Sequence, residues 1–501
     1  MNKKTAKKLE RRKKKLAKRV KRKNWDDQPK PMLNGSNIHY EIDGKQSGIS
    51  QGGIGVIHQL SKKIGLTNEI DSRISLLKRH LPYHESDHIL NIAYNLIAGG
   101  ENLEDLELLR SNDAYLDALG AKIIPDPTTA GDYLRRYDQS SILELMEVKN
   151  TVRKRIWNNQ PENFKEEAVI NVDGTICSTW GECKQGMDIS YDGQWGYHPL
   201  IISLSKTREA LYIVNRSGNA PSHLDSPFWI DKTLDLVGDT FKKVKLRGDT
   251  DFSLTGHFDK WDKKCTFIFG MDARRNLIDI AETINDENWQ ENEKKPKYKV
   301  KTKKRKRPAN VKDEIVRKRR FKKIQTESEF ISEFEYRPGK CSQSYRIIVL
   351  KKNLEVVKGD MNLFPEVRYF FYITNDWKST AQQLLQFYRK RADHENDIEQ
   401  LKNGAKALHS PSNTLESNWA YMVIASLAWD LKAWYGLLMP YRYLGLMVLR
   451  MEFKKFVNTF INIPCLIIKT GRKICYRIIG YNNKLKHIIN FSEMLKKFAF
   501  P

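Results

Sequence analysis

Short apolar runs that are rich in β-branched residues and end on an acid constrain the fold of this chain more than any other feature. They include AVINVD (Ala168–Asp173), KVKLRGD (Lys243–Asp249) and CTFIFGMD (Cys265–Asp272). Amphipathic segments such as FWIDKTLDLVGDTF lie between the runs and carry the spacing of helices. Strands that alternate with helices predict an α/β sheet with helices packed on its faces.

The segments on either side of this alternation carry different patterns. From Gly52 to about Val152, apolar residues recur at three- and four-residue spacing, which predicts a compact helical domain. Short strand candidates and a basic run follow the alternation, and they predict a mainly β insertion. A long helix is then expected over Lys378–Gly404, with Ser379 or Thr380 as its N-cap and its glycine as its end.

Positive charge is concentrated in two runs. The chain of 501 residues has a formal net charge of +26. Lys3–Lys23 and Lys294–Lys323 are rich in Lys and Arg, a pattern that is typical of disordered arms for polyanions. Because neutralising phosphates releases counterions, nucleic acid is the expected partner.

Membrane, secreted and zinc-binding classes do not fit the sequence. The most apolar C-terminal run, Trp419–Trp429, has about half the length of a membrane span, and Asp430 and Lys432 follow it. No apolar core or cleavage site follows the basic stretch at the N-terminus. The six cysteines form no Cys-x-x-Cys pair, which argues against a zinc module or a disulfide framework and favours reduced thiols in a cytoplasm.

Four residues of the expected long helix fall on one stripe: Tyr388, Arg391, Glu395 and Lys402. At about 100° per residue, they lie within an arc of about 60°. A carboxylate that is flanked by two cations and a phenol suits a divalent metal surrounded by phosphates. A solvated helix face of ion pairs is the alternative that this segment alone leaves open.

Asp173 and Asp249 each end a short apolar run, where α/β folds place ligand sites. Either acid alone is typical of a loop cap. Two strand-end acids and a helix acid, however, can bind two divalent ions about 4 Å apart for phosphodiester cleavage, and Mg²⁺ prefers oxygen ligands. Asp251 is a rival to Asp249, and Glu399 on the expected helix face is a rival to Glu395.

With these residues assembled, the chain resembles the DDE transposases of bacterial insertion sequences, within the RNase H-like superfamily. The resemblance rests on the acid in NVDGT, on RGDTDF, and on the signature Tyr-x-x-Arg-x-x-x-Glu-x-x-x-x-x-x-Lys at 388–402. The insertion-sequence group numbered thirteen-eighty is especially similar, through GYHPLIISL, TFIFGMDARRN and PCLIIKTGRKICYRIIGYN. The resemblance covers nearly the whole chain from about Gly52 onward.

The resemblance implies an α/β fold with an RNase H-like catalytic core, in which helices flank a mixed sheet. A mainly β insertion would interrupt this core, and a helical domain would precede it. This helical domain could bind the terminal repeats through a helix-turn-helix-like surface, or it could pack against the catalytic core. The implied segments are a basic disordered arm with its linker, a helical N-terminal DNA-binding domain, the first part of the core, the insertion with its basic run, and the core helix with a C-terminal helical region. Their ranges are 1–37, 38–160, 161–272, 273–376 and 377–501.

The resemblance also implies the site residues. The catalytic, metal-binding acids would be Asp173, Asp249 and Glu395, and the DNA-binding residues would be Tyr388, Arg391 and Lys402. Two Mg²⁺ ions would be bound, with Mn²⁺ as a substitute. Family members often have Asp-Ser-Gly-Phe at the second acid, whereas this chain has Asp-Thr-Asp-Phe at 249–252. We favour Asp249 over Asp251, and the signature spacing selects Glu395 over Glu399.

The implied function is cut-and-paste DNA transposition in the bacterial cytoplasm, at the nucleoid. The protein would bind the terminal inverted repeats of its element, pair them in a homodimeric synaptic complex, cleave the ends and join them to target DNA. An RNase H-like nuclease or resolvase without strand transfer, and a non-catalytic basic nucleic-acid-binding protein, are the alternatives. Core packing is favoured over base stacking for the tryptophans Trp180, Trp195, Trp261 and Trp289.

Overall fold

The computed structural model describes residues 1, 3–21, 32–33, 35–41, 46–292, 310–359, 361–362, 366–471 and 473–498. The chain forms two compact units, and each is assembled from separate segments. Unit 1 comprises Met1–Lys165, Thr175–Ala220 and Asn396–Pro501, and unit 2 comprises Glu166–Gly174 and Pro221–Glu395. Neither unit is one continuous stretch of the chain, because segments that are distant in sequence pack together.

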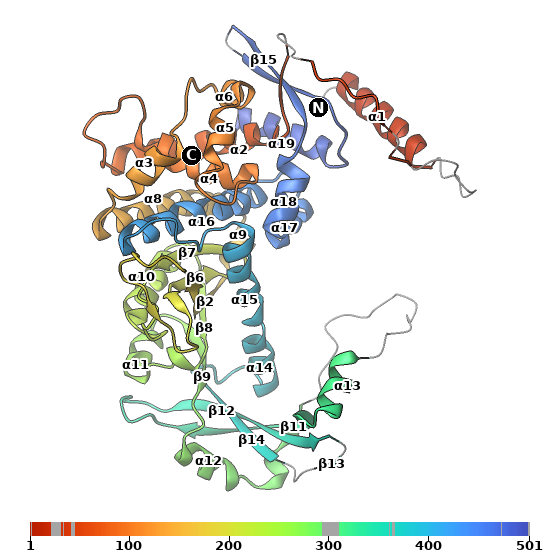
Figure 1. The fold of residues 1–501 in the computed structure, drawn as a ribbon. Helices are drawn as coiled ribbons and strands as arrows, with labels where there is room; N and C mark the ends of the chain where they lie inside the picture. Colours follow the sequence, from red (N-terminus) through yellow and green to blue (C-terminus); the bar gives the residue numbers. More distant parts are fainter. Residues whose placement is uncertain are drawn as a thin grey trace. The chain divides into compact units, whose positions relative to one another are not determined.

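Unit 2 is organised around a mixed β-sheet (Figure 1). Its strands, in spatial order, are β10 (Gln290–Glu291), β11 (Lys322–Tyr336), β12 (Tyr345–Lys358), β14 (Glu366–Thr374), β9 (Thr266–Met271), β8 (Lys243–Gly248) and β2 (Glu167–Gly174), and β13 (Met361–Asn362) pairs with β12. The pairs β2–β8 and β8–β9 are parallel, and the other pairs are antiparallel. The three apolar runs that end on acids thus form strands of one mixed sheet, as predicted, and the structure shows that these three strands are parallel.

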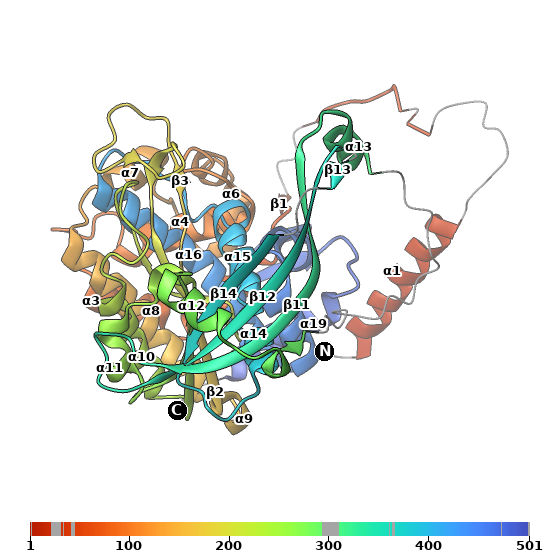
Figure 2. The same ribbon diagram turned by 90° about the horizontal axis from the view of Figure 1, so that it is seen from below.

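The insertion consists mainly of the long antiparallel strands β11, β12 and β14, which lie side by side in Figure 2. The helices of unit 2 are α10 (Ser226–Gly238), α11 (Phe258–Trp261), α12 (Arg275–Glu282), α13 (Val311–Lys318) and α14 (Ala381–Arg389), with 3-10 turns η1 (Thr250–Phe252), η2 (Thr255–His257) and η3 (Asp286–Asn288). Most of the basic run that begins at Lys294 lies outside the described residues.

Unit 1 is mainly helical. Its helices are α1 (Lys3–Lys21), α2 (Ile54–Lys63), α3 (Leu66–Arg73), α4 (Glu85–Ala98), α5 (Leu106–Arg110), α6 (Asp113–Leu119), α7 (Pro127–Leu134), α8 (Gln139–Asn158), α9 (Glu162–Lys165), α16 (Leu415–Leu437), α17 (Arg442–Arg450), α18 (Phe453–Phe456) and α19 (Leu485–Lys497), with the π-helical turn η5 (Val457–Ile461). Its strands are β1 (Ser47–Ile49), β15 (Cys465–Thr470) and β16 (Lys473–Ile478) in one sheet, β3 (Cys177–Ser178), β5 (Trp195–Tyr197) and β4 (Asp188–Ile189) in another, and the hairpin β6 (Leu200–Leu204) and β7 (Glu209–Val214).

The core of unit 1 lies around α16, which is buried on all sides between α4, α8, α17 and β7 (Figure 1). A buried ionic network joins these elements. Glu209 accepts hydrogen bonds from Arg153 Nε at 3.0 Å and from the indole nitrogens of Trp157 at 2.9 Å and Trp434 at 2.8 Å. Asp430 Oδ2 lies 2.9 Å from Arg153 Nη2. Asp430 Oδ2 also lies 3.0 Å from Lys149 Nζ, so two carboxylates face two buried cations.

Part of the basic arm that the charge run predicted to be disordered is helical. Residues Lys3–Lys21 form helix α1, in which Arg12 Nη1 donates hydrogen bonds to the carbonyl oxygens of Ile478 at 2.9 Å and Gly480 at 3.1 Å. Alanine, leucine, lysine and arginine are good helix formers, and this propensity explains the difference. In the described part of the chain, no helix has the length and apolar character needed to cross a bilayer.

Candidate active site

The segment that carries the predicted stripe is not one continuous helix. Helix α14 ends at Arg389, the turn Lys390–Arg391 follows, and α15 (Ala392–Glu399) and the π-helical turn η4 (Gln400–Gly404) complete the segment. Two main-chain hydrogen bonds span the turn, from Arg391 N to Tyr388 O at 2.8 Å and from His394 N to Arg391 O at 2.7 Å. The predicted projection onto one ideal helix is therefore wrong. The predicted start is confirmed, because Thr380 caps α14.

Arg391 connects two of the predicted acids within unit 2. Its Nη1 donates to Asp173 Oδ2 at 2.6 Å, and its Nη2 donates to Glu395 Oε1 at 3.0 Å. The Arg391 and Asp173 side chains are largely buried, whereas that of Glu395 is 58% exposed. The turn before α15 places this arginine between a strand acid and a helix acid.

Asp249 follows the last residue of β8 and caps the short turn η1. Its Oδ1 accepts a hydrogen bond from the Asp251 main-chain nitrogen at 3.0 Å. The strand does not continue, so the rival Asp251 lies in the turn and is exposed. Asp249 and Asp251 therefore have different environments, a difference that the sequence alone could not reveal.

Burial and neighbouring charges shift the pKa values of the acids. Burial raises the pKa of Asp173 to about 7, Arg391 opposes the rise, and Asp249 and Glu395 add to it. Burial also raises the pKa of Asp249, and the charge of Asp251 adds to that rise. Each shift has the sign expected for carboxyls that are held near one another in a partly desolvated site.

Tyr388 packs over the same end of the sheet. Its ring meets Tyr372 edge to face at a centroid distance of 4.7 Å. A Cβ atom on Gly270 of β9 would lie 3.1 Å from the Tyr388 hydroxyl and 2.7 Å from Thr250 Oγ1. Gly270 is thus a position where a side chain would collide with the site, a common reason for glycine inside a strand. In the sequence, the only sign of this close approach was the position of Gly270 inside the apolar run FIFGMD.

Gly270→Ala is expected to slow the DNA cleavage predicted from the sequence about tenfold or more. The added methyl must displace Thr250 or Tyr388, and overpacking of this kind costs about 1–3 kcal/mol. Gly238→Ala is the matched control, because a Cβ there meets nothing within 4 Å. Rates of end cleavage per folded molecule check the prediction, and equal rates in the two variants would contradict it.

Lys402 and Glu399 differ in their surroundings from the other predicted site residues. Lys402 belongs to unit 1, where its Nζ donates to the carbonyl oxygen of Ile176 at 2.7 Å. Glu399 is exposed and accepts a hydrogen bond from Asn403. Glu395, by contrast, contacts Arg391. The two rival acids Glu395 and Glu399 therefore also have different environments.

A divalent metal matches the donor atoms of this site but not their present arrangement. Asp173, Asp249 and Glu395 offer the hard carboxylate oxygens that Mg²⁺ prefers. Among the described residues, however, no three acidic, histidine or cysteine side chains are close enough to hold a metal ion together. Arg391 donates one hydrogen bond to each of two carboxylates. The donor types therefore fit a metal, which Asp173, Asp249 and Glu395 would hold.

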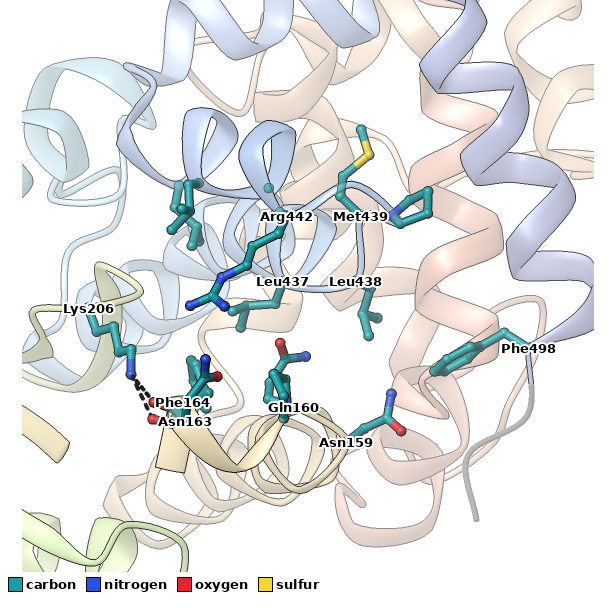
Figure 3. A pocket seen from close by; sticks show the side chains of 16 residues that line it. Asn159, Gln160, Asn163, Phe164, Lys206, Leu437, Leu438, Met439, Arg442 and Phe498 are labelled. Atoms are coloured by element: carbon teal, nitrogen blue, oxygen red, sulfur yellow. Dashed lines mark hydrogen bonds between the residues drawn. The ribbon is translucent and has the colours of Figure 1, made fainter. Parts of the chain in front are cut away.

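A pocket of about 310 Å³ in unit 1 differs from the site of the three acids in the residues that line it (Figure 3). No carboxylate lines it, and its cations are Lys206 and Arg442. Lys206 Nζ donates to the Phe164 carbonyl oxygen at 2.7 Å. Without an acidic group this pocket offers no metal ligands of the type predicted, and it is not the site of the three acids.

The tryptophans do not share one environment. Trp261 is fully buried, as predicted for core packing, whereas Trp180 is 88% exposed and Trp195 is 46% exposed. The packing prediction is therefore wrong for Trp180, which lies beyond the end of strand β3, and for Trp195. Trp289 is half-buried, with its ring centroid 6.3 Å from that of Tyr369.

Three comparisons with known proteins complete the description of the site. Residues 30–496 match the family described as transposase DDE domain group 1. No curated protein matches the sequence. Among solved structures, the cryo-EM structure of the piggyBac transposase synaptic complex with hairpin DNA is similar at 11% sequence identity and a TM-score of 0.35, covering 82% of this chain and 81% of that chain. A structural likeness this weak carries no argument about this protein.

Proposed function

The chain belongs to the transposase DDE domain family, group 1, and from this membership we propose that it cleaves the ends of its own DNA element and joins them to target DNA. The observation that carries the proposal is the contact of Arg391 with both Asp173 and Glu395, next to the charge of Asp249. The family supplies the reaction class, and this cluster supplies acids of the required type within one compact unit.

The proposed reaction consists of two phosphoryl transfers. In the first, a water oxygen bonds to the phosphorus at the element's end as the bond to the 3′-oxygen breaks. In the second, the freed 3′-hydroxyl attacks a target phosphodiester, and a target 3′-oxygen leaves. Asp173, Asp249 and Glu395 would hold divalent ions, which when bound activate the attacking oxygen and stabilise the leaving one. Catalysis would rest mainly on positioning and charge stabilisation.

Arg391 and Tyr388 are proposed to bind phosphates of the element's end. The Arg391 guanidinium already contacts two carboxylates and has the planar fork that suits phosphate oxygens. Lys402, on the η4 turn of unit 1, is proposed to bind a DNA phosphate as well. A homodimer that pairs two terminal inverted repeats is the proposed active assembly, because each end requires its own set of acids.

The proposed DNA-binding surface of the N-terminal helical domain includes the loop between α3 and α4. Lys78 and Arg79 are exposed in this loop, and Leu81 is 81% exposed. The base of the loop is anchored, because the buried Glu85 carboxylate accepts hydrogen bonds from the Leu76 and Leu77 main-chain nitrogens, both at 2.7 Å. An anchored basic loop is suited to contact DNA phosphates.

The double variant Lys78→Ala/Arg79→Ala is expected to reduce the salt dependence of end binding. Each lost phosphate contact lowers the slope of log K against log salt by about 0.9, so the slope should fall by about two. The matched control is Lys62→Ala/Lys63→Ala, which removes two exposed lysines from α2. Gel-shift titrations across a salt series give the slopes. Equal losses in both double variants would indicate diffuse attraction rather than contact by the loop.

The proposed function is tested with the element's ends, Mg²⁺ and a target plasmid, following cleavage and strand transfer as separate products. Cleavage followed by joining of the 3′ ends is the expected result. Cleavage without joining would identify a nuclease or resolvase of related chemistry. DNA binding without cleavage, unaffected by substitution of the three acids, would identify a non-catalytic nucleic-acid-binding protein.

A further inference from the structure

A buried arginine connects its own strand, β8, with two other segments that carry residues of the acid site. Arg247 is 2% exposed. Its Nε donates to Asn171 Oδ1 at 2.5 Å, and its Nη1 donates to the carbonyl oxygen of Phe387 at 2.7 Å. Its guanidinium carbon also lies 5.0 Å from the centroid of the Phe387 ring.

The residues that make these contacts lie close in sequence to the predicted site residues. Arg247 precedes Asp249 by two residues, and its acceptor Asn171 precedes Asp173 by two residues. Asn171 and Arg247 are paired in the parallel register of β2 and β8. Residues two apart in a strand point to the same face, so the Asn171–Arg247 contact lies one step below Asp173. The third segment, at Phe387, leads directly to Tyr388.

We propose that Arg247 is a positioning residue that sets the placement of Asp173, Asp249 and Tyr388 relative to one another. The inference rests on the proposed function, in which these groups act on one phosphodiester. One guanidinium fork connects β2, β8 and α14, the elements from which the three groups project. Burying a cation is costly unless its hydrogen bonds are satisfied, and here those bonds connect the segments whose spacing the chemistry requires.

A role in the fold alone is the competing explanation, and it makes a different prediction. An arginine that only stabilises unit 2 would affect the folded fraction and leave each folded molecule fully active. A positioning residue affects the rate in the folded protein, because a misplacement of about 1 Å can cost about a hundredfold in rate. Substrate affinity would change little, because the side chain of Arg247 is buried.

The variants are Arg247→Lys, Asn171→Ala and their combination, with Arg346→Lys as the matched control. Arg346 is also buried in unit 2, and its Nη1 donates to the carbonyl oxygens of Asp376 at 2.9 Å and Ser379 at 2.6 Å. It therefore tests the loss of a buried fork that does not contact the strands of the acids. Circular dichroism and thermal melting give the folded fraction of each variant.

For Arg247→Lys we expect kcat for end cleavage to fall about a hundredfold per folded molecule, with KM within about threefold. Asn171→Ala should lose less, and the double variant should be no slower than Arg247→Lys, because both changes remove the same hydrogen bond. Arg346→Lys should keep kcat near that of the unaltered protein. A normal kcat per folded molecule in Arg247→Lys, or losses that multiply in the double variant, would overturn the inference.

Calorimetric titration with Mn²⁺ alone supplies a second measurement that needs no activity. Substitution of residues that orient metal ligands weakens metal affinity by about 10- to 100-fold, and that loss is expected for Arg247→Lys but not for Arg346→Lys. If the unaltered protein binds Mn²⁺ but does not cleave ends, the proposed function fails while the titration still decides the role of Arg247. Unchanged Mn²⁺ affinity in Arg247→Lys would then reject the inference.

Discussion

Asp249→Asn is expected to slow end cleavage by about a thousandfold or more, whereas Asp251→Asn should leave the rate within about threefold. Asp249 is partly buried, and its charge acts on both Asp173 and Tyr388. Asp251 is exposed in the η1 turn and contacts Asp249 through its main-chain nitrogen. Asparagine keeps the size and the turn-capping oxygen of the side chain, so a loss of rate would report the missing charge.

Single-turnover cleavage of a labelled end duplex in Mg²⁺ provides the measurement, and gel shifts without metal verify that each variant still binds the duplex. The same comparison applies to Glu395→Gln against Glu399→Gln, with the large loss expected for Glu395. Retained cleavage in Asp249→Asn together with its loss in Asp251→Asn would transfer the role of the second acid to Asp251.

Glu209→Ala is expected to destabilise the protein by about 3–5 kcal/mol, the usual cost of removing one partner from a buried ion pair. The substitution would leave the buried Arg153 guanidinium with Asp430 as its remaining carboxylate partner in the network. It would also remove the acceptor for the indole nitrogens of Trp157 and Trp434. Urea unfolding followed by circular dichroism measures the change through the transition midpoint.

Glu107→Ala is the control for this measurement. Glu107 pairs with Arg110 at 3.1 Å, but both side chains are nearly half exposed. Surface pairs contribute about 0–1 kcal/mol, so the midpoint should barely move. A small effect of Glu209→Ala, comparable to that of Glu107→Ala, would show that water or a rearranged side chain satisfies Arg153 after the substitution.

The parts of the fold that depend on local pattern were predictable from the sequence. The apolar runs that end at Asp173 and Asp249 are neighbouring parallel strands, and Thr380 caps the helix before Tyr388. These features follow from alternation, strand length and capping chemistry, which act within a few residues. Asp173 and Asp249 therefore lie at strand ends, as the strand pattern predicted.

The break at Lys390–Arg391 was not predictable, because no proline or glycine marks it. Its cause is tertiary: Leu384 and Leu385 pack on the sheet before the turn, and Arg391 pairs with Asp173 within it. The contacts of Arg247 were not predictable for the same reason, since their acceptors lie on another strand and on a helix. Contacts between distant segments decide such features, and no periodicity reports them.

The buried network around Arg153 also has a consequence for folding during synthesis on the ribosome. Arg153 and its partner Asp430 are separated by 277 residues, which take roughly 15 to 55 seconds to translate at about 5–20 residues per second. During that interval helix α8 has no α16 to cover it, and its guanidinium has no Asp430 to neutralise it. Unit 1 can therefore complete its core only late in translation, and a chain released before Asp430 would be a substrate for chaperones and proteases rather than a transposase.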